Sequence, residues 1–380
     1  AAFTLARTIS MFAGLIGGGF VLQSLLKLGS EKPSRETSRL ANTASLMAIC
    51  FSVVMAVLLL LFSGVLDSFY SEIDLSRIMP MVVLTAFTGT LSGVPRNILL
   101  TRFGTSRVMT ADLVSLLIKG GAVGWHILSG TLTSAVQVLL ASSAANVAAF
   151  AVNGWNARKY VDFSAGVGRE ALGRVVSFAV FSLGTSLAGF VYTRTDVLML
   201  GKLAPPEDVA AYGASRSLTG MITMISAAAN MVLMPYISRA WSEGRYRLLM
   251  KKNIQAILYV QLIQLPVVLA LVLAPKWIID TVYEGKYTEF WPILAILGVT
   301  AVFRPFGSLF STMGSAMGKP QYSFWAILIS AVVNVIFNII LIPSMGGTGA
   351  ALATGTAVFA GAAAIVILTV GRWRREKEER

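Results

Sequence analysis

The chain of 380 residues is strongly apolar: 56% of its residues are hydrophobic, 13% are charged, and the mean hydropathy is +0.73. Exposing that much apolar surface to water is unfavourable by roughly 25 cal/mol per Å², so the composition excludes a soluble domain and indicates an all-α integral membrane protein. A net charge of +13 is also typical of nucleic-acid-binding proteins. Here, however, most Lys and Arg lie in short segments between apolar runs, where they orient membrane helices. We therefore expect no nucleic-acid partner.

Eleven apolar runs are long enough to cross about 30 Å of hydrocarbon as helices. In chain order they lie at residues 1–26, 40–66, 77–101, 107–128, 132–154, 173–200, 208–237, 253–274, 289–315, 321–343 and 346–371. The chain begins with Ala inside the first run, so we expect that a preceding helix is missing. The only cysteine, Cys50, excludes an internal disulfide, and we expect it to be a small buried residue.

Charges in the connections alternate along the chain. Basic connections lie at residues 27–39, 96–107, 158–174, 239–252, around Lys319 and in the tail 372–380. The connections between them are acidic or uncharged, at residues 67–74, 129–130, 207–208, 280–284 and 344–345. Because positive loops stay in the cytoplasm, the alternation predicts a cytoplasmic C-terminus and places Ala1 outside.

An internal repeat indicates two similar halves. Arg7 and Arg216 each lie early in an apolar run and are 209 residues apart (216 − 7). Residues 67–70 and 79–80 are echoed by residues 280–283 and 291–292. We expect two pseudo-symmetric six-helix lobes related by a parallel repeat around a central cavity. The N-terminal lobe would span residues 1–171 without its first helix, the C-terminal lobe residues 172–371, and a basic cytoplasmic tail residues 372–380.

Charge inside an expected span is costly and tends to face a cavity. Arg194 lies near the outer end of its span and can reach the membrane surface, whereas the other cationic candidates are Arg7, Lys119, Arg216 and Arg304. A guanidinium binds phosphate oxygens through two parallel hydrogen bonds, so these residues are candidates for binding a phosphate or pyrophosphate group. Lys119 fits a residue that reaches the membrane surface equally well. At Arg304, the following Pro305 should loosen the helix and leave carbonyl groups without partners.

A second candidate site contains neutral oxygen ligands and one carboxylate. Asn334 and Asn338 lie one helical turn apart, and Thr354 follows on the last expected span. These side chains either form hydrogen bonds between helices or bind a small cation together with Asp196. Asp196 itself either belongs to such a site, pairs with the nearby Arg194, or lies at the membrane surface.

Motifs of known enzymes are absent: the sequence has no HExxH, GxSxG or GxxxxGK[ST]. We therefore expect no catalytic residues and no enzymatic activity. We interpret the run Gly17-Gly18-Gly19 as close helix packing rather than a phosphate-binding loop.

Four segments resemble the Wzx-type polysaccharide flippases: residues 194–201 (RTDVLMLG), 210–212 (AAY), 234–238 (MPYIS) and 347–354 (GTGAALAT). Membership of this family implies the fold of the multidrug/oligosaccharidyl-lipid/polysaccharide exporter superfamily. It also implies transport of an undecaprenyl-pyrophosphate-linked oligosaccharide to the outer leaflet of the bacterial inner membrane by alternating access. In the similar lipid II flippases, cavity arginines hold the pyrophosphate, and Arg7 and Arg216 match their places.

The resemblance carries further expectations. Those relatives bind sodium through residues that Asp196, Asn334, Asn338 and Thr354 match, although an Asn stands here where an acidic ligand is usual. Membrane lipid and the lipid-linked oligosaccharide would be partners, with a glycan polymerase and a chain-length regulator of the same pathway as further candidates.

Other functions remain open at the level of sequence. A multidrug cation exporter of the same fold would need an acidic cavity, whereas the spans hold several arginines and only Asp196 as a clear acid. A membrane glycan polymerase or ligase would need a large extracytoplasmic loop with acid and base residues, and the expected outer loops are short. A membrane scaffold without transport activity would not need the cavity charges.

The alternation of loop charge makes a testable prediction of topology. In a Cys50→Ala background, an impermeant thiol reagent should label Lys202→Cys from outside the cell, and should label Lys251→Cys only after permeabilisation. Labelling of Lys202→Cys from the cytoplasmic side alone would contradict the assigned orientation.

Overall fold

A computed structural model describes residues 2–19, 21–22, 35–70, 76–101, 105–131, 134–160 and 162–378. These residues are almost entirely helical and contain no strand, which confirms the expected all-α class. They form two compact units, Ala2–Leu187 and Ala188–Arg380. Helix α8 (Arg169–Leu203) crosses from one unit to the other, and the expected boundary between residues 171 and 172 lies near the start of this helix.

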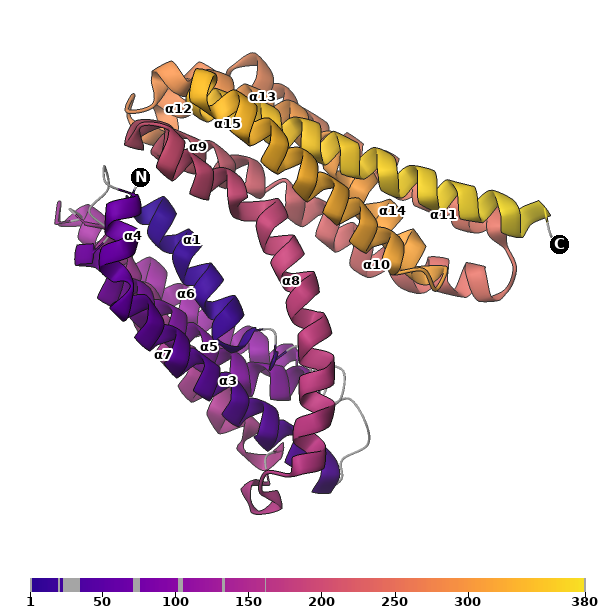
Figure 1. Ribbon diagram of the computed structural model, residues 1–380. Helices are drawn as coiled ribbons and strands as arrows, with labels where there is room; N and C mark the ends of the chain where they lie inside the picture. The colour runs from indigo at the N-terminus through magenta and orange to yellow at the C-terminus, as the bar shows by residue number, and fades with distance from the viewer. Residues whose placement is uncertain are drawn as a thin grey trace. The chain divides into compact units, whose positions relative to one another are not determined.

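The first unit is a bundle built around α5 and α7. Figure 1 shows its helices lying along one another, and α5 packs against α1, α3 and α7, while α6 packs against α7. Its elements are α1 (Ala2–Gly14), η1 (Leu15–Gly19), α3 (Arg35–Leu61), α4 (Ser63–Phe69), η2 (Ser76–Ile78), α5 (Met79–Thr101), α6 (Thr105–Leu128), α7 (Ala135–Ala157), η3 (Arg158–Tyr160), η4 (Phe163–Ala165) and the first part of α8.

Local sequence explains where some of these elements begin and end. Ser134 caps α7: its side chain accepts a hydrogen bond from the Val136 amide, and the Gln137 side chain returns to the Ser134 amide. In η1, Gly18 has φ 129°, and a Cβ on this residue would lie 2.7 Å from the Ala48 carbonyl oxygen of α3. The glycine run is therefore a close-packing site, as expected.

Two of the expected basic connections meet at one end of the first unit. Arg39 Nε donates to the Ala165 carbonyl at 2.9 Å, and Asn42 Nδ2 donates to the Asp162 carbonyl at 2.9 Å. Arg174 pairs with Glu36. The contacts join the regions around residues 27–39 and 158–174, as their assignment to the same side of the membrane requires.

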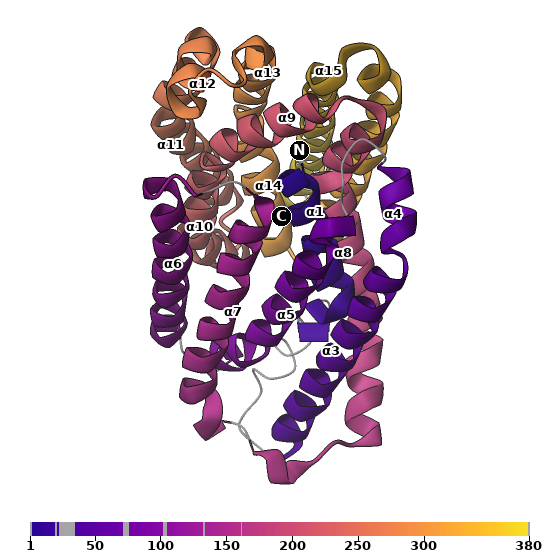
Figure 2. The ribbon, with the colours of Figure 1, turned by 90° about the vertical axis from the view of Figure 1, so that its left-hand side faces the viewer.

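The second unit packs α11 with α10, α13 and α14, and places α15 against α13 and α14. In Figure 2, α12 and α13 lie at the same end of this unit, where both contact α11. Its elements, after the last part of α8, are α9 (Pro206–Gly220), α10 (Thr223–Ser242), α11 (Tyr246–Leu273), α12 (Pro275–Tyr283), η5 (Thr288–Phe290), α13 (Trp291–Ala301), α14 (Arg304–Ala316) and α15 (Gln321–Glu378).

The expected span at residues 289–315 is broken into α13 and α14. Pro305 lacks an amide donor and its ring opposes the carbonyl four residues earlier, which is that of Ala301. Helix α11 supplies the missing donors: Gln261 Nε2 donates to the Val302 carbonyl at 2.7 Å, and Gln264 Nε2 lies 3.5 Å from the Ala301 carbonyl oxygen. The break therefore leaves these carbonyls with partners inside the protein, as membrane depth demands.

Helix α15 holds two expected spans, 321–343 and 346–371, joined by a sharp kink at Gly346. The backbone there has φ 53° and ψ −132°, a conformation that is essentially restricted to glycine. The carboxylate of Asp208, in the first turn of α9, accepts a hydrogen bond from the Gly347 amide at 2.5 Å. Asp208 thus caps the second half of α15 and joins two connections that were both expected on the outer side.

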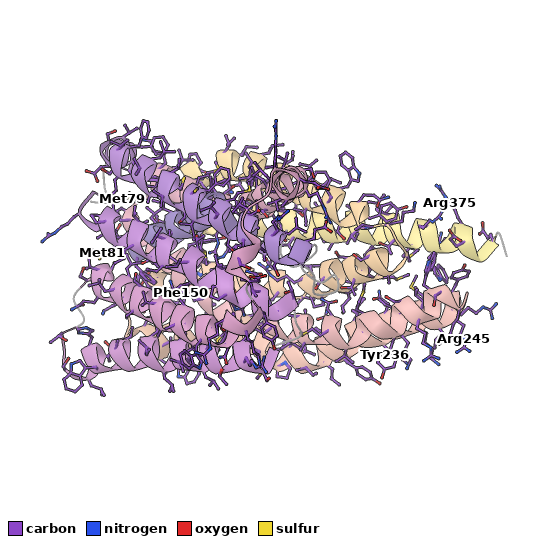
Figure 3. The ribbon with its side chains drawn as sticks, turned by 90° about the horizontal axis from the view of Figure 1, so that it is seen from below. Met79, Met81, Phe150, Tyr236, Arg245 and Arg375 are labelled. Atoms are coloured by element: carbon purple, nitrogen blue, oxygen red, sulfur yellow. The ribbon has the colours of Figure 1, made fainter. Side chains whose placement is uncertain are left out.

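The opposite end of this unit is basic. Arg245, between α10 and α11, and Arg375, near the end of α15, lie at the same end of the unit in Figure 3. Trp373 Nε1 donates to the Tyr246 carbonyl at 2.8 Å and joins these segments. The expected cytoplasmic regions 239–252 and 372–380 are therefore neighbours.

Apolar side chains cover the outer surfaces of the helices, including Leu61 on α3 and Leu262 on α11, as expected for lipid contact. Seven stretches of the described helices are long and apolar enough to cross a membrane, and the last of them, Gln321–Glu376, contains two of the expected spans. The chain is a multi-pass membrane protein. The expectation for Cys50 was wrong, because this residue is exposed on α3.

The same local order of elements occurs in both units. A long helix, a short helix, a 3-10 turn and a helix with proline at its second position follow one another as α3, α4, η2 and α5, and again as α11, α12, η5 and α13. These are the segments in which the sequence repeat was found. The repeat therefore has a counterpart in local structure.

The kink in α15 gives a prediction for stability. Gly346→Ala should lower the free energy of unfolding by about 1–3 kcal/mol, because the backbone is strained for alanine and the new Cβ would lie 2.5 Å from Asp208 Oδ1. The matched control is Gly371→Ala on the same helix, where an added Cβ meets nothing within 4 Å. It should be neutral or stabilise by about 0.5–1 kcal/mol. Thermal unfolding of the purified variants measures both, and equal melting temperatures would contradict the analysis.

Candidate functional site

A pocket of about 430 Å³ lies within the first unit and contains two of the predicted cations, Arg7 of α1 and Lys119 of α6. Hydroxyl and amide side chains from α5 and α7, including Thr90, Ser142 and Asn146, also line it. None of the described residues that line this pocket carries a carboxylate. The pocket therefore concentrates positive charge beside neutral hydrogen-bonding groups.

Helix α1 directs Arg7 into this pocket by its pattern of small and apolar residues. Leu5, Ala6, Thr8 and Ile9 are buried, whereas Arg7 is exposed. In the described residues neither Arg7 nor Lys119 forms an ion pair. Unpaired cations at membrane depth mark a functional site by default.

Arg216 has a different environment from Arg7. In the second unit its guanidinium donates to the carboxylate of Asp196 and to the Thr193 carbonyl, both on α8. Asp196 is 1% exposed, and the Arg216 side chain is 23% exposed. Two of the donor groups that would clasp a phosphate are therefore engaged within the protein.

The carboxylate of Asp196 is the centre of a network that joins α8, α9 and α15. Its Oδ2 accepts hydrogen bonds from the Tyr212 hydroxyl and Arg216 and lies 3.4 Å from Thr354 Oγ1, while Oδ1 accepts from the Val197 amide at 2.8 Å. The Tyr212 hydroxyl oxygen also lies 2.9 Å from Thr354 Oγ1. A buried carboxylate is stable only when it is paired and hydrogen-bonded, and this one is both.

The four residues predicted to bind sodium form two separate pairs, Asp196 with Thr354 and Asn334 with Asn338. Asn338 Nδ2 donates to Asn334 Oδ1 at 3.0 Å, and Asn338 Oδ1 is buried without a partner in the described part of the chain. No hydrogen bond among these residues links either Asn to Asp196. Arg216 pairs with Asp196 and neutralises its charge, so the arrangement has no net negative charge.

The fourth predicted cation, Arg304, lines a separate cavity of about 310 Å³ within the second unit. The structure thus distributes the four residues among three environments: Arg7 with Lys119, Arg216 with Asp196, and Arg304 among serine side chains.

Two members of the Asp196 network were missed in the sequence, the Tyr212 side chain and the Thr193 carbonyl. Tyr212 lies four residues before Arg216, so both project from the same face of α9. That spacing could have identified it. Nothing in the sequence marks the carbonyl of Thr193.

Comparison with known proteins places the chain in a family. A family model described as "Polysaccharide biosynthesis protein" matches residues 30–292. The chain is 25% identical over 178 residues to a probable low-salt glycan biosynthesis flippase, Agl15, of Haloferax volcanii, a match covering 47% of this chain and 38% of that protein. Matches to curated relatives span 24% to 38% of their lengths.

Solved structures establish the fold. The lipid II flippase MurJ in an inward closed conformation matches with a TM-score of 0.79 and 14% identity, covering 99% of this chain and 83% of that one. An inward-facing multidrug resistance MATE transporter of the MOP superfamily matches with a TM-score of 0.77 and 17% identity, covering 100% and 92%. The chain therefore belongs to the polysaccharide biosynthesis protein family and has the fold of MOP superfamily transporters.

Proposed function

We propose that this protein is a flippase that moves an oligosaccharide, linked through pyrophosphate to a polyprenyl lipid such as undecaprenol, to the outer leaflet by alternating access. The observation that carries the proposal is the first-unit pocket, in which Arg7 and Lys119 line one cavity without a carboxylate. Family membership and the name of the Haloferax volcanii relative support the same class of substrate.

The chemistry of the pocket suits a pyrophosphate group. Two like charges repel each other, so a pocket lined by two cations without an ion pair favours an anion that neutralises both. The guanidinium of Arg7 can hold two phosphate oxygens at once, whereas the ammonium of Lys119 acts as a point charge. Hydroxyl groups such as that of Ser142 can complete the hydrogen bonding.

The pocket argues against the alternative of a multidrug cation exporter, because an organic cation would meet two positive charges and no carboxylate there. A glycan polymerase or ligase would need paired acid and base groups. None of the described residues that line the first-unit pocket is an acid. We propose transport without catalysis.

We further propose that the Asp196 network holds the second unit in the arrangement described above. It connects α8, α9 and α15 through charge-assisted hydrogen bonds to one carboxylate. Movement of Arg216 away from Asp196 would leave a buried negative charge, which needs another cation. Sodium is our proposal for that cation in a state where Arg216 is released.

The pathway partners follow from the proposed substrate. A flippase delivers its lipid-linked glycan to whatever enzyme extends it on the outer face, so a glycan polymerase and a chain-length regulator are proposed partners. The membrane would be the bacterial inner membrane if the carrier is undecaprenol.

Substitution of Arg7 tests the proposed function. Arg7→Gln should reduce the amount of surface glycan in cells that lack the native protein by about tenfold or more, because a hydrogen-bonded charge pair to the head group is lost. Arg7→Lys should recover part of the activity, since it keeps the charge and loses the fork. Lys119→Gln should also reduce transport.

The matched control for this test is Arg96→Gln. Arg96 lies on α5 of the same unit, is partly exposed and pairs with Asp112 outside the pocket, so its loss should leave transport unchanged. Expression and membrane insertion are checked by immunoblot. Wild-type surface glycan in both Arg7→Gln and Lys119→Gln would refute the head-group site.

The Asp196 network gives a prediction that does not depend on transport. Asp196→Asn or Arg216→Gln alone should each lower the free energy of unfolding by about 3–5 kcal/mol, because an unpaired charge stays buried. The double variant should lose much less than the sum of the two. Thermal unfolding of the purified proteins measures this coupling.

Sodium provides a further arm of the same experiment. The wild type should have the same melting temperature in sodium chloride and in choline chloride at matched ionic strength. The melting temperature of Arg216→Gln should be higher in sodium chloride. Sodium stabilisation of the wild type that is lost in Asp196→Asn would show instead that the ion binds with Arg216 in place.

A further inference from the structure

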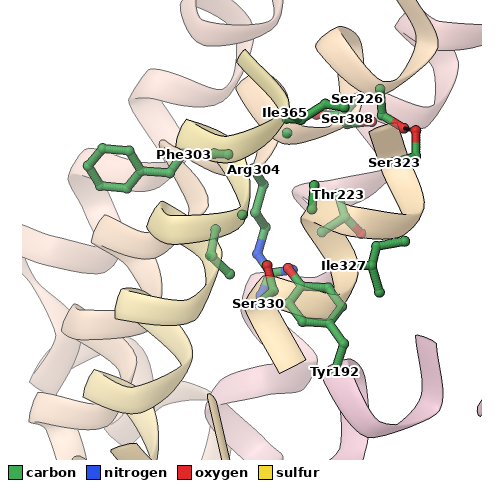
Figure 4. A pocket seen from close by; sticks show the side chains of 16 residues that line it. Tyr192, Thr223, Ser226, Phe303, Arg304, Ser308, Ser323, Ile327, Ser330 and Ile365 are labelled. Carbon is green, nitrogen blue, oxygen red and sulfur yellow. Dashed lines mark hydrogen bonds between the residues drawn. The ribbon is translucent and has the colours of Figure 1, made fainter. Parts of the chain in front are cut away.

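The second unit contains a cavity of its own between α8, α10, α14 and α15 (Figure 4). Its volume of about 310 Å³ falls at the lower end of the roughly 300–1,000 Å³ that small-molecule sites occupy. It accommodates a sugar-sized group but not a polyprenyl chain with a complete oligosaccharide. The proposed head-group site leaves this cavity without a role.

The lining combines one cation with many hydroxyl groups and apolar walls. Among the described residues that line the cavity, Arg304 is the only charged one. Apolar walls include Phe303, Ile327 and Ile365. The hydroxyl groups come from four helices: Tyr192, Thr223, Ser226, Ser308, Ser311, Ser323 and Ser330.

Arg304 is positioned by the helix break described above. It is the first residue of α14, so its side chain and the positive end of that helix dipole lie together. In Figure 4 its guanidinium points toward the hydroxyl groups of Tyr192 and Ser330. No ion pair of Arg304 occurs within the described ranges of the chain, so its charge is available for a ligand.

Two buried serines point to a ligand independently of the arginine. Ser330 is 3% exposed and Ser226 is 6% exposed, and both line the cavity. In the part of the chain that the structure describes, neither hydroxyl has a protein hydrogen-bond partner. By contrast, the hydroxyl groups of Ser311 and Ser323 are hydrogen-bonded to each other, with their oxygens 2.5 Å apart. Buried polar groups are normally hydrogen-bonded. These hydroxyls therefore have hydrogen-bonding capacity that a bound molecule can use.

The combination selects one class of ligand. A guanidinium without a protein partner favours an oxyanion, serine hydroxyls exchange hydrogen bonds with hydroxyl groups, and the apolar walls can cover the apolar face of a sugar ring. Two cations line the first-unit pocket, but only one lines this cavity. The ligand here should therefore carry less negative charge than a pyrophosphate.

We propose that the Arg304 cavity binds an anionic sugar, either a uronic acid or a sugar phosphate, with the oxyanion on Arg304 and the sugar hydroxyls on Ser226 and Ser330. The inference rests on the proposed function only for the source of the sugar, which would be the transported glycan. Tyr192 of this cavity lies four residues before Asp196 on α8. Occupancy would thus contact the helix that carries the ion-pair network.

Titration calorimetry of the purified full chain in lipid nanodiscs tests the proposal with five probes: D-glucuronate, D-glucose 1-phosphate, D-glucose, inorganic phosphate and inorganic pyrophosphate. At least one of the two charged sugars should bind, and D-glucose should bind about tenfold or more weakly, because it lacks the oxyanion. Binding of glucuronate identifies a uronic acid, and binding of glucose 1-phosphate identifies a sugar phosphate.

Variants locate the binding. Arg304→Gln should lower the affinity for the charged sugar by about tenfold or more. Arg304→Lys should restore part of that affinity, and Ser330→Ala should lower it several-fold. If Arg304→Gln fails to fold, Ser330→Ala and Ser226→Ala carry the test. Arg7→Gln is the matched control: it should keep the affinity for the charged sugar and lose the affinity for inorganic pyrophosphate. Arg304→Gln should keep the affinity for pyrophosphate.

Three results would overturn the proposal: no binding of either charged sugar, equal binding of D-glucose or, in Arg7→Gln, of inorganic phosphate, or wild-type affinity for the charged sugar in both Arg304→Gln and Ser330→Ala. Each of these leaves the effect of Arg7→Gln on surface glycan untouched. Loss of transport in Arg7→Gln without binding of charged sugars would therefore refute this inference alone, and the reverse pattern would refute the head-group site alone.

Discussion

The second unit depends on the pairing of one buried carboxylate. Asp196 is almost completely shielded from solvent, and a lone charge in such a place would be expensive. Arg216, Tyr212, Thr354 and the Val197 amide together satisfy it. Because these partners come from three helices, the requirement to neutralise Asp196 also fixes how α8, α9 and α15 meet.

The same constraint explains the irregular helices. Membrane protein interiors tolerate broken backbone only where other groups replace the lost hydrogen bonds. Gln261 and Gln264 supply donors at the break between α13 and α14, and Asp208 accepts from the amide beyond the kink at Gly346. Both of these interruptions are therefore matched by a polar side chain on a neighbouring helix.

Hydropathy and loop charge predicted the helical membrane class, because they report local properties that the lipid environment imposes on each segment. The breaks at Pro305 and Gly346 could also be predicted from the sequence, because proline and glycine affect the backbone conformation at their own positions. Pairing did not. Arg7 and Arg216 occupy matching positions in the repeat, but only Arg216 has a carboxylate beside it, and that fact depends on how α8 and α9 pack.

The four predicted cations illustrate what the sequence could not separate. A charge inside an apolar run indicates that something neutralises it, but the neutralising group can be a residue of the chain or a ligand. Coordinates divide the set: Arg216 is balanced by Asp196, whereas Arg7, Lys119 and Arg304 lie in pockets whose lining residues include no acid. Cations left without a partner in the protein are the ones that an anionic substrate can satisfy. On the two proposals made above, the Arg7 pocket would take the head group of a lipid-linked glycan and the Arg304 cavity one of its charged sugars.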